Sequence, residues 1–230
     1  MTVTQTPSTP GRLVRNRTAA TAVASVAAAL LALSLFMTVA VINVPRHVSD
    51  ADVLAWWQNS SNRTAGVASG MFALIVGATI AVVANHVQRL DTAGRAPAWL
   101  AFGRSMAGAV TALWMVTGAV RGLVGLLVDT QGEPLPGAEV LRYTTGLNYA
   151  LLGQSGMAAL ALFILAISVL VLRTAALGRW IAYIGLACAA VMLAAVVAQY
   201  GAFATPLAIL WSLCLAVAFW RAPAAVATKS

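Results

Sequence analysis

The chain has 230 residues, of which 61% are hydrophobic and only 9% are charged, and its formal net charge is +8. Soluble globular domains carry about a quarter charged residues, so this composition excludes a soluble domain and indicates an integral membrane protein. The positive charge needs no polyanion to explain it, because ten basic residues and one acid fall on one side of the predicted spans, and four basic residues and five acids on the other. We therefore expect no nucleic-acid partner.

Six apolar stretches separated by short polar connections predict an all-α fold, a polytopic bundle of six transmembrane helices. Lys and Arg are enriched in the short loops that stay in the cytoplasm, so both termini are expected to be cytoplasmic. Arginine outnumbers lysine thirteen to one, which is typical of GC-rich bacterial genes, and we expect a multi-pass protein of the bacterial cytoplasmic (inner) membrane. The residues assigned to the inner side are Arg12, Arg15, Arg17, Arg89, Asp91, Arg95, Arg104, Arg173, Arg179, Arg221 and Lys229.

Residues 1–17 are polar, rich in Thr and Pro, and lack periodic apolar positions, which predicts a disordered cytoplasmic tail. The first span is expected over residues 18–44. This run is too long for the apolar region of a signal peptide, which has roughly 7 to 15 residues, and it approaches a full bilayer crossing. The transmembrane domain is predicted to cover residues 18–221, followed by a second cytoplasmic tail over 222–230.

The first outer loop contains the start of a short helix. Ser49 can cap its first turn, and Asp52 three residues later favours the positive end of the helix dipole. Trp56 and Trp57 follow, and tryptophan favours the membrane interface. The sequence predicts a helix lying in the headgroup layer, either as an anchor or as a lid over a ligand.

The remaining spans are separated by connections rich in Gly and Pro. Gly94 and Pro97 punctuate a cytoplasmic turn over residues 91–97, and residues 129–145 form an outer loop too broken by Gly and Pro to cross lipid. Spans two to six are predicted at residues 65–87, 99–128, 146–172, 180–200 and 206–220.

Arg121 is the first candidate for a ligand-binding residue. It lies eight positions before Asp129, hence roughly 12 Å below the predicted outer end of the third span. Ionisable groups at such depth are costly and mark functional sites by default. The alternative is that the long side chain reaches outward to the headgroups, and the sequence leaves both interpretations open.

Polar residues of the fourth and fifth spans accompany Arg121 at a similar predicted depth. Asn148 and Ser155 are seven positions apart, which places them on one face of an α-helix. An outward-facing polar pocket for an anionic or amphipathic ligand is one interpretation, with Glu139 as a counter-ion from the loop above; hydrogen bonding between helices is the other. The predicted ligand-binding residues are Arg121, Tyr149, Gln154, Ser155, Gln199 and Tyr200.

Two pairs of glycines are spaced four residues apart inside apolar spans. Gly66 with Gly70, and Gly118 with Gly122, give the small-residue spacing that lets helix backbones approach closely. We interpret these glycines as seams between helices of one chain, with a homodimer face as the alternative.

Residues 171–185 join the fourth and fifth predicted spans, with an arginine after a long apolar helix (Arg173) and a basic-aromatic pair (Arg179 and Trp180) entering the next. This turn, and the general layout of the chain, resembles a family of small bacterial six-span membrane proteins of unknown function, common in actinobacteria. The resemblance implies a fold and no activity.

The sequence contains no motif for hydrolase, protease or nucleotide chemistry, and we expect no catalytic residue, no metal site and no cofactor. The predicted function is a non-catalytic membrane protein that binds a partner or modulates the envelope. A small-molecule or lipid binder or transporter with a pocket around Arg121 is one alternative, and a membrane enzyme with an unfamiliar site is another. Expected partners are membrane lipids and either another membrane protein or a second copy.

Overall fold

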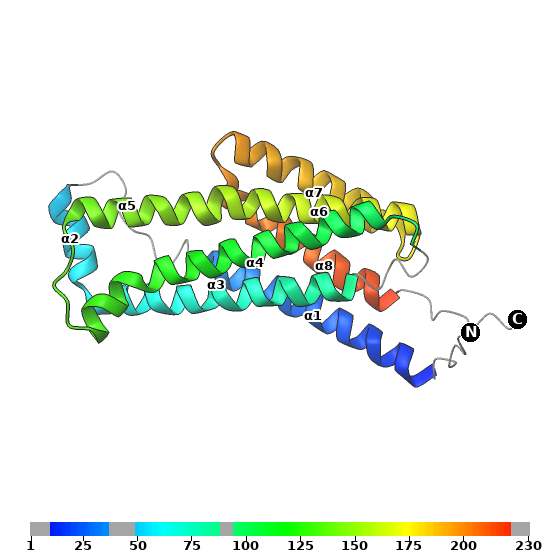
Figure 1. Ribbon diagram of the computed structural model, residues 1–230, viewed down its shortest axis with the longest axis horizontal. Coiled ribbons are helices and arrows are strands. Elements are labelled where there is room, and N and C mark those ends of the chain that lie inside the picture. The colour runs from blue at the N-terminus through cyan, green and yellow to red at the C-terminus, as the bar shows by residue number, and fades with distance from the viewer. Residues whose placement is uncertain (1–9, 37–48, 88–93, 222–230) are drawn as a thin grey trace, which may run out of the picture.

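The computed structural model describes residues 10–36, 49–87 and 94–221, and these residues form helices and no strand (Figure 1). Two π-helices, η3 and η4, and one 3-10 helix, η5, interrupt or extend the α-helices among the described residues. In chain order the elements are α1 (Pro10–Phe36), α2 (Asp50–Gln58), α3 (Ser60–Val87), α4 (Pro97–Gly125), η3 (Leu126–Thr130), α5 (Ala138–Asn148), η4 (Tyr149–Gly156), α6 (Met157–Thr174), α7 (Arg179–Val197), η5 (Gly201–Ala204) and α8 (Thr205–Arg221).

Among the described residues, five helical stretches are long and apolar enough to cross a membrane, which confirms the prediction of an all-α, multi-pass fold. They are Ser60–Val87, Pro97–Thr130, Ala138–Thr174, Arg179–Val197 and Gly201–Arg221.

The predicted first span, residues 18–44, lies only partly within the described residues. Its described apolar part, Thr18–Leu33, is shorter than a full crossing, and residues 37–44 lie outside the described residues, as do 1–9 and 222–230 of the predicted tails. Residues 10–17, assigned from the sequence to a disordered tail, belong to α1. Proline suits the first position of a helix because its missing N–H would have no intrahelical partner there.

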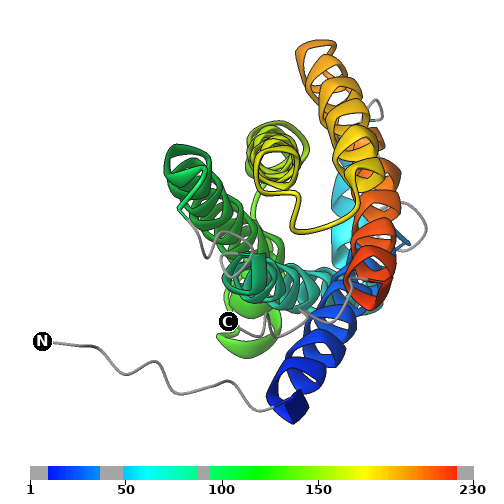
Figure 2. The same cartoon turned by 90° about the vertical axis from the view of Figure 1, so that its right-hand side faces the viewer.

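The helices pack both against neighbours in the chain and against distant ones, and the first described helix, α1, packs against the last, α8. α3 packs on α1 and α4, α6 on α4 and α7, and α8 on α7 and α1 (Figure 2). The stretch that contains α6 is the most enclosed of the five, because 67% of its most apolar segment is buried, whereas only 33% of the corresponding segment of α7 is. Its Phe163 packs edge-on against Trp211 of α8, with ring centroids 6.1 Å apart. α6 therefore forms the centre of the core.

The helices differ in length, and the difference creates a projection at one end. α5, η4 and α6 form one continuous helix of 37 residues, about 55 Å long, whereas α7 has 19 residues and is about 28 Å long. A bilayer has a hydrocarbon core of about 30 Å. Figure 1 shows α4 and α5 extending past the ends of α7 and α8 toward α2.

This projection corrects the predicted second outer loop. The sequence assigned residues 129–145 to a loop and began the fourth span at residue 146, but α5 already begins at Ala138. Polar residues on its surface hid the helix from a hydropathy argument. The buried side chain of Leu141 shows that α5 has an apolar side, which packs against α2 and the outer part of α4.

Candidate functional site

The corner between α2 and α3 is held by side chains that satisfy the end of α2. Ser49 caps its start as predicted, with the Asp52 N–H donating to Ser49 Oγ at 3.2 Å, and the Asp52 side chain accepts from the Ser49 backbone to complete a capping box. At its other end, Asn62 Nδ2 donates to the carbonyl oxygen of Trp56 at 2.8 Å. The last carbonyls of a helix have no partner within the helix, so these contacts fix the end of α2 to the first turn of α3.

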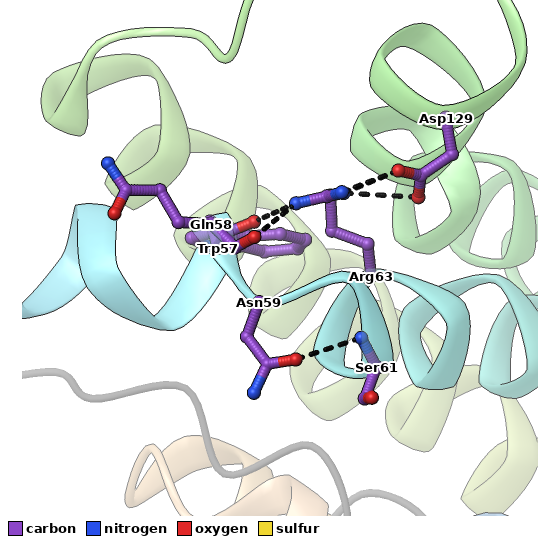
Figure 3. Close-up of polar contacts among 6 residues, drawn as sticks. All are labelled: Trp57, Gln58, Asn59, Ser61, Arg63 and Asp129. Carbon is purple, nitrogen blue, oxygen red and sulfur yellow. Dashed lines mark hydrogen bonds and ion pairs between the residues drawn. The ribbon is translucent and has the colours of Figure 1, made fainter.

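Arg63 extends this corner to the outer end of α4 (Figure 3). Its Nη1 donates to the carbonyl oxygens of Trp57 and Gln58 at 2.7 and 2.8 Å. Its Nε and Nη2 donate to the Asp129 carboxylate, at 2.9 and 2.6 Å to Oδ1. One guanidinium thus joins α2, α3 and η3, and only 11% of the Arg63 side chain is exposed. We call this contact set the Arg63 clamp.

A second ion pair and an apolar cluster join α2 to α5. Arg142 Nη2 donates to Asp50 Oδ1 at 2.9 Å, in a more exposed pair than the Arg63 clamp. Between the two ion pairs lies an apolar cluster. We call the assembly of α2, the first turn of α3, η3 and α5 the outer cap, after the side of the membrane that the sequence predicts for this end. The buried members of the cluster are Val53, Trp57, Val124 and Leu141.

The outer cap changes the interpretation of the tryptophan pair. The sequence placed Trp56 and Trp57 together in the headgroup layer, but Trp57 is only 5% exposed and packs inside the cluster. Trp56 is half-buried, with its ring edge-on to that of Trp57 at 4.8 Å. Only one member of the pair is therefore available to meet lipid, and α2 is part of the folded cap.

The predicted glycines lie in the interface between α3 and α4. A Cβ built on Gly118 would lie 2.6 Å from the carbonyl oxygen of Gly70, and one on Gly70 would meet the carbonyl oxygen of Gly118. A Cβ on Gly66 would lie 3.3 Å from the Arg121 carbonyl oxygen, whereas one on Gly122 would have its nearest neighbour at 3.9 Å. Three of the four glycines thus permit a close approach of the two backbones.

Arg121 also lies on this interface, because its Nη1 donates to Ser69 Oγ of α3 at 2.8 Å.

The level of Arg121 along the bundle follows from the contact between α4 and η4. A Cβ on Gly156 would lie 3.5 Å from Trp114 Nε1, so Gly156 and Trp114 lie at the same level. On α4, Arg121 lies seven residues, about 10 Å, closer to the cap than Trp114 does. On η4, Tyr149 lies seven residues closer to the cap than Gly156 does. Tyr149 donates its hydroxyl to the carbonyl oxygen of Gln199 at 2.6 Å, just beyond the end of α7. Arg121 therefore lies near the level at which α7 ends.

The other predicted ligand-binding residues divide into two groups. Tyr149 and Gln199 are brought together by the hydrogen bond just described, and Gln154 is half-buried with a shielded amide nitrogen. Ser155 and Tyr200 are exposed, and the Tyr200 ring packs against Phe203. The α-helical spacing that placed Asn148 and Ser155 on one face does not apply, because η4 is a π-helix with more residues per turn.

Sequence reasoning missed the residues that hold the outer cap. Arg63 and Asp129 are 66 positions apart, and no local pattern pairs them. Gly125 was also missed, although a Cβ there would lie 2.7 Å from Val67 Cγ2 of α3. The glycines at positions 118, 122 and 125 were the signal that the close packing of α3 and α4 continues to Gly125.

The outer cap leaves one side of α5 uncovered. Val140, Tyr143 and Leu147 lie on one face of the helix, and all three are exposed, with Tyr143 at 74%. The opposite face carries Leu141, which is fully buried in the apolar cluster. The three side chains therefore form an apolar stripe on a preformed helix, which we call the α5 stripe.

Comparison with protein-family models, with curated proteins and with solved structures gives no match to this chain. The resemblance of residues 171–185 to the actinobacterial six-span family stays a prediction, and the function is argued from the contacts above.

Proposed function

We propose that this chain is a non-catalytic, multi-pass protein of the bacterial cytoplasmic membrane that binds a partner protein through its outer cap. The observation that carries the proposal is the α5 stripe, since Val140, Tyr143 and Leu147 lie exposed on a helix that projects past the end of α7. Exposed apolar residues grouped on one face mark interaction sites, and tyrosine is enriched at the centres of protein interfaces.

The contacts that hold the cap in place favour the role of a docking platform and disfavour that of a mobile lid. The Arg63 clamp holds one end of α2, the Arg142–Asp50 pair holds the other, and the apolar cluster lies between them. A preformed surface binds a partner with a smaller loss of conformational entropy than a segment that must first become ordered.

The proposed topology has six spans, with α1 as the first and both termini in the cytoplasm. Its support is the charge distribution, because positive residues are retained on the cytoplasmic side. The acids of the described residues all belong to the cap end, at Asp50, Asp52, Asp129, Glu133 and Glu139. The opposite end of the bundle carries Arg95, Arg104, Arg173, Arg179 and Arg221.

The topology predicts a pattern of cysteine labelling. In a variant whose Cys188 and Cys214 are replaced by alanine, Ser61→Cys at the cap is expected to react with a membrane-impermeant maleimide in intact cells. Ala98→Cys, exposed at the start of α4, is expected to react only after the cells are opened. Reporters fused to the two termini are expected to lie on the same side, because the number of spans is even. Reporters on opposite sides would contradict six spans.

The docking surface predicts site-specific crosslinking. A photoreactive benzoylphenylalanine at Tyr143 is expected to give a protein adduct in growing cells, since this side chain is at the centre of the α5 stripe. Tyr183 provides the matched control, because it is also an exposed helical tyrosine but lies near the start of α7, at the other end of the bundle. An adduct of twice the mass of the chain would identify the partner as a second copy, and equal adducts at both positions would contradict the proposal.

A small-molecule binder around Arg121 is the second candidate. It is favoured by Asn148 Oδ1 and Gln154 Nε2, which are shielded from solvent and have no hydrogen-bond partner among the described residues. Buried polar groups ordinarily have partners, so two such atoms in or beside η4 would suit a polar ligand near the outer end of α7.

A further inference from the structure

Thr117 is a buried polar residue of α4 whose hydroxyl makes no hydrogen bond within the fold. Its exposed fraction is 0%, and Thr117 Oγ1 has no hydrogen-bond partner among the described residues. Threonines inside helices commonly donate to the carbonyl oxygen four residues earlier, as Thr79, Thr144 and Thr174 do here. Thr117 makes no such bond. Buried polar groups ordinarily have partners, so this hydroxyl is an exception that requires an explanation.

A second polar group lies opposite Thr117, at the end of α5. Val124 of α4 and Leu141 of α5 belong to the same apolar cluster of the outer cap, which fixes where the two helices meet. Thr117 lies seven residues before Val124, and Asn148 lies seven residues after Leu141. Residues seven apart share a face of an α-helix and are about 10 Å apart along it. Thr117 and Asn148 therefore lie at the same distance from the cluster, on the faces of the two helices that meet there.

The two helices remain in contact beyond this level. A Cβ on Gly156 of η4 would lie 3.5 Å from Trp114 Nε1 of α4, so the helices are packed on both sides of Thr117 and Asn148. Asn148 Oδ1 is shielded from solvent and has no hydrogen-bond partner among the described residues. Two polar groups thus face each other between packed helices without bonding to each other. A third group that bonds to both would satisfy them.

Arg121 brings positive charge to the same place. It lies four residues, one helical turn, after Thr117, so the two side chains are neighbours on the surface of α4. Its Nη1 donates to Ser69 Oγ at 2.8 Å, and Ser69 is only 1% exposed, so this end of the guanidinium lies inside the protein. A guanidinium has five N–H donors and no acceptor, and a serine hydroxyl that accepts one hydrogen bond can still donate another. Donors therefore outnumber acceptors here.

We propose that Thr117, Asn148 and Arg121 bind one oxyanion, the carboxylate or phosphate group of a small ligand, between α4 and the end of α5. The inference rests on the second candidate function above, which it makes specific, and it does not depend on the docking surface. An oxyanion accepts several hydrogen bonds, and hydrogen bonds to a charged group are the stronger ones. Thr117 donates its hydroxyl, the Asn148 amide donates when its nitrogen is turned toward the ligand, and the guanidinium balances the negative charge.

The test is thermal unfolding of the full chain in an uncharged detergent at constant ionic strength. The protein is titrated separately with acetate, inorganic phosphate and decanoate, and with decanol as the uncharged partner of decanoate. At least one oxyanion is expected to raise the Tm to a plateau, because it binds the folded state, and decanol is expected to have no comparable effect. A plateau with acetate or phosphate identifies a free anion as the ligand, and a plateau with decanoate alone identifies an amphiphile.

Thr117→Val separates a binding residue from a structural one. Valine keeps the shape of threonine but removes a hydroxyl that has no partner, so the Tm of the free protein is expected to be equal or higher. The apparent Kd for the oxyanion is expected to weaken about fivefold, because one hydrogen bond to the ligand is lost. Thr111→Val is the matched control. The Thr111 hydroxyl donates to the Gly77 carbonyl oxygen of α3 at 3.0 Å, so this variant is expected to have a lower Tm and the wild-type Kd.

Asn148→Asp provides an independent check, because it places a carboxylate where the ligand would bind. This variant is expected to have a higher Tm than the wild type, since the new carboxylate pairs with Arg121, and to lose its response to the oxyanions. A lower Tm together with an unchanged response would show that Asn148 does not face Arg121, and would contradict the site.

Two further results would overturn the oxyanion site. One is the absence of a plateau with all three oxyanions, and the other is a wild-type Kd in the Thr117→Val variant. If decanol gives the same plateau as decanoate and Thr117→Val removes both, a polar ligand binds here and the second candidate function stands, but the negative charge is wrong. If no compound raises the Tm while the Tyr143 adduct forms as expected, the oxyanion site is wrong and the docking surface stands.

Discussion

Alanine at Gly118 is expected to destabilise the chain by about 2 to 3 kcal/mol, because the added methyl group overpacks the seam between α3 and α4. The new Cβ would lie 2.6 Å from the carbonyl oxygen of Gly70 and 3.0 Å from Leu74 Cγ. A side chain can rotate away from such a contact, but the backbone of α3 cannot move without shifting the whole helix. The loss is measured by reversible unfolding in detergent with a denaturant titration.

Gly122 and Gly108 are the controls for this substitution. Alanine at Gly122 would have its nearest neighbour at 3.9 Å, and alanine at Gly108 would have none within 4 Å. At these positions alanine is expected to be neutral or to stabilise by roughly 0.5 to 1 kcal/mol, because it favours the helix over glycine. Equal losses at Gly118 and Gly122 would show that the seam is not the tight contact. An effect of Gly118→Ala that varied with protein concentration would instead favour a homodimer face.

The apolar spans and the start of α2 were predictable because they depend on local composition. The span predicted at residues 65–87 corresponds to the apolar part of α3 and ends at the same residue, Val87. The capping box of Ser49 and Asp52 is a local interaction over three residues and is present. The glycine spacing indicated close packing for the same reason, although it could not tell that Gly122 would be the looser position.

The contacts that build the outer cap were not predictable from local patterns. α5 is polar on average, so hydropathy assigned it to a loop, and only its contact with α2 reveals the apolar side that carries Leu141. Trp57 was assigned to the membrane interface because tryptophan favours it, but burial against α4 and α5 outweighs that preference here.

The proposed pocket around Arg121 shows how backbone geometry limits a prediction from spacing. The prediction assumed an α-helical period through residues 148–155, but most of this segment is the π-helix η4. Ser155 therefore is exposed, and Arg121 donates a hydrogen bond to Ser69 on α3, a residue that the sequence did not single out. A π-helix has no recognised sequence signature here, apart from Gly153 and Gly156, which also fit ordinary helix packing.

Replacing Arg63 with methionine is expected to release α2 from the rest of the outer cap. Methionine keeps much of the length and apolar stem of arginine but removes every donor to Asp129 and to the carbonyl oxygens of Trp57 and Gln58. Charge-assisted hydrogen bonds are the stronger ones, and the Trp57 carbonyl, which is partly buried, is costly to leave without a partner. Hydrogen exchange at the amides of α2 is expected to accelerate at least about tenfold, while exchange in α6 and α7 stays unchanged.

Arg142→Met is the matched control, because it removes an arginine from the same cap but from a more exposed ion pair, with 34% of the Arg142 side chain and 71% of the Asp50 side chain exposed. Exposed ion pairs contribute little to stability, so exchange in α2 is expected to change by less than about threefold. The same variants decide whether the cap must be rigid to act as a platform. If Arg63→Met frees α2 yet crosslinking from Tyr143 is undiminished, the partner binds α5 alone; if exchange in α2 does not change, the apolar cluster and not the Arg63 clamp holds the cap.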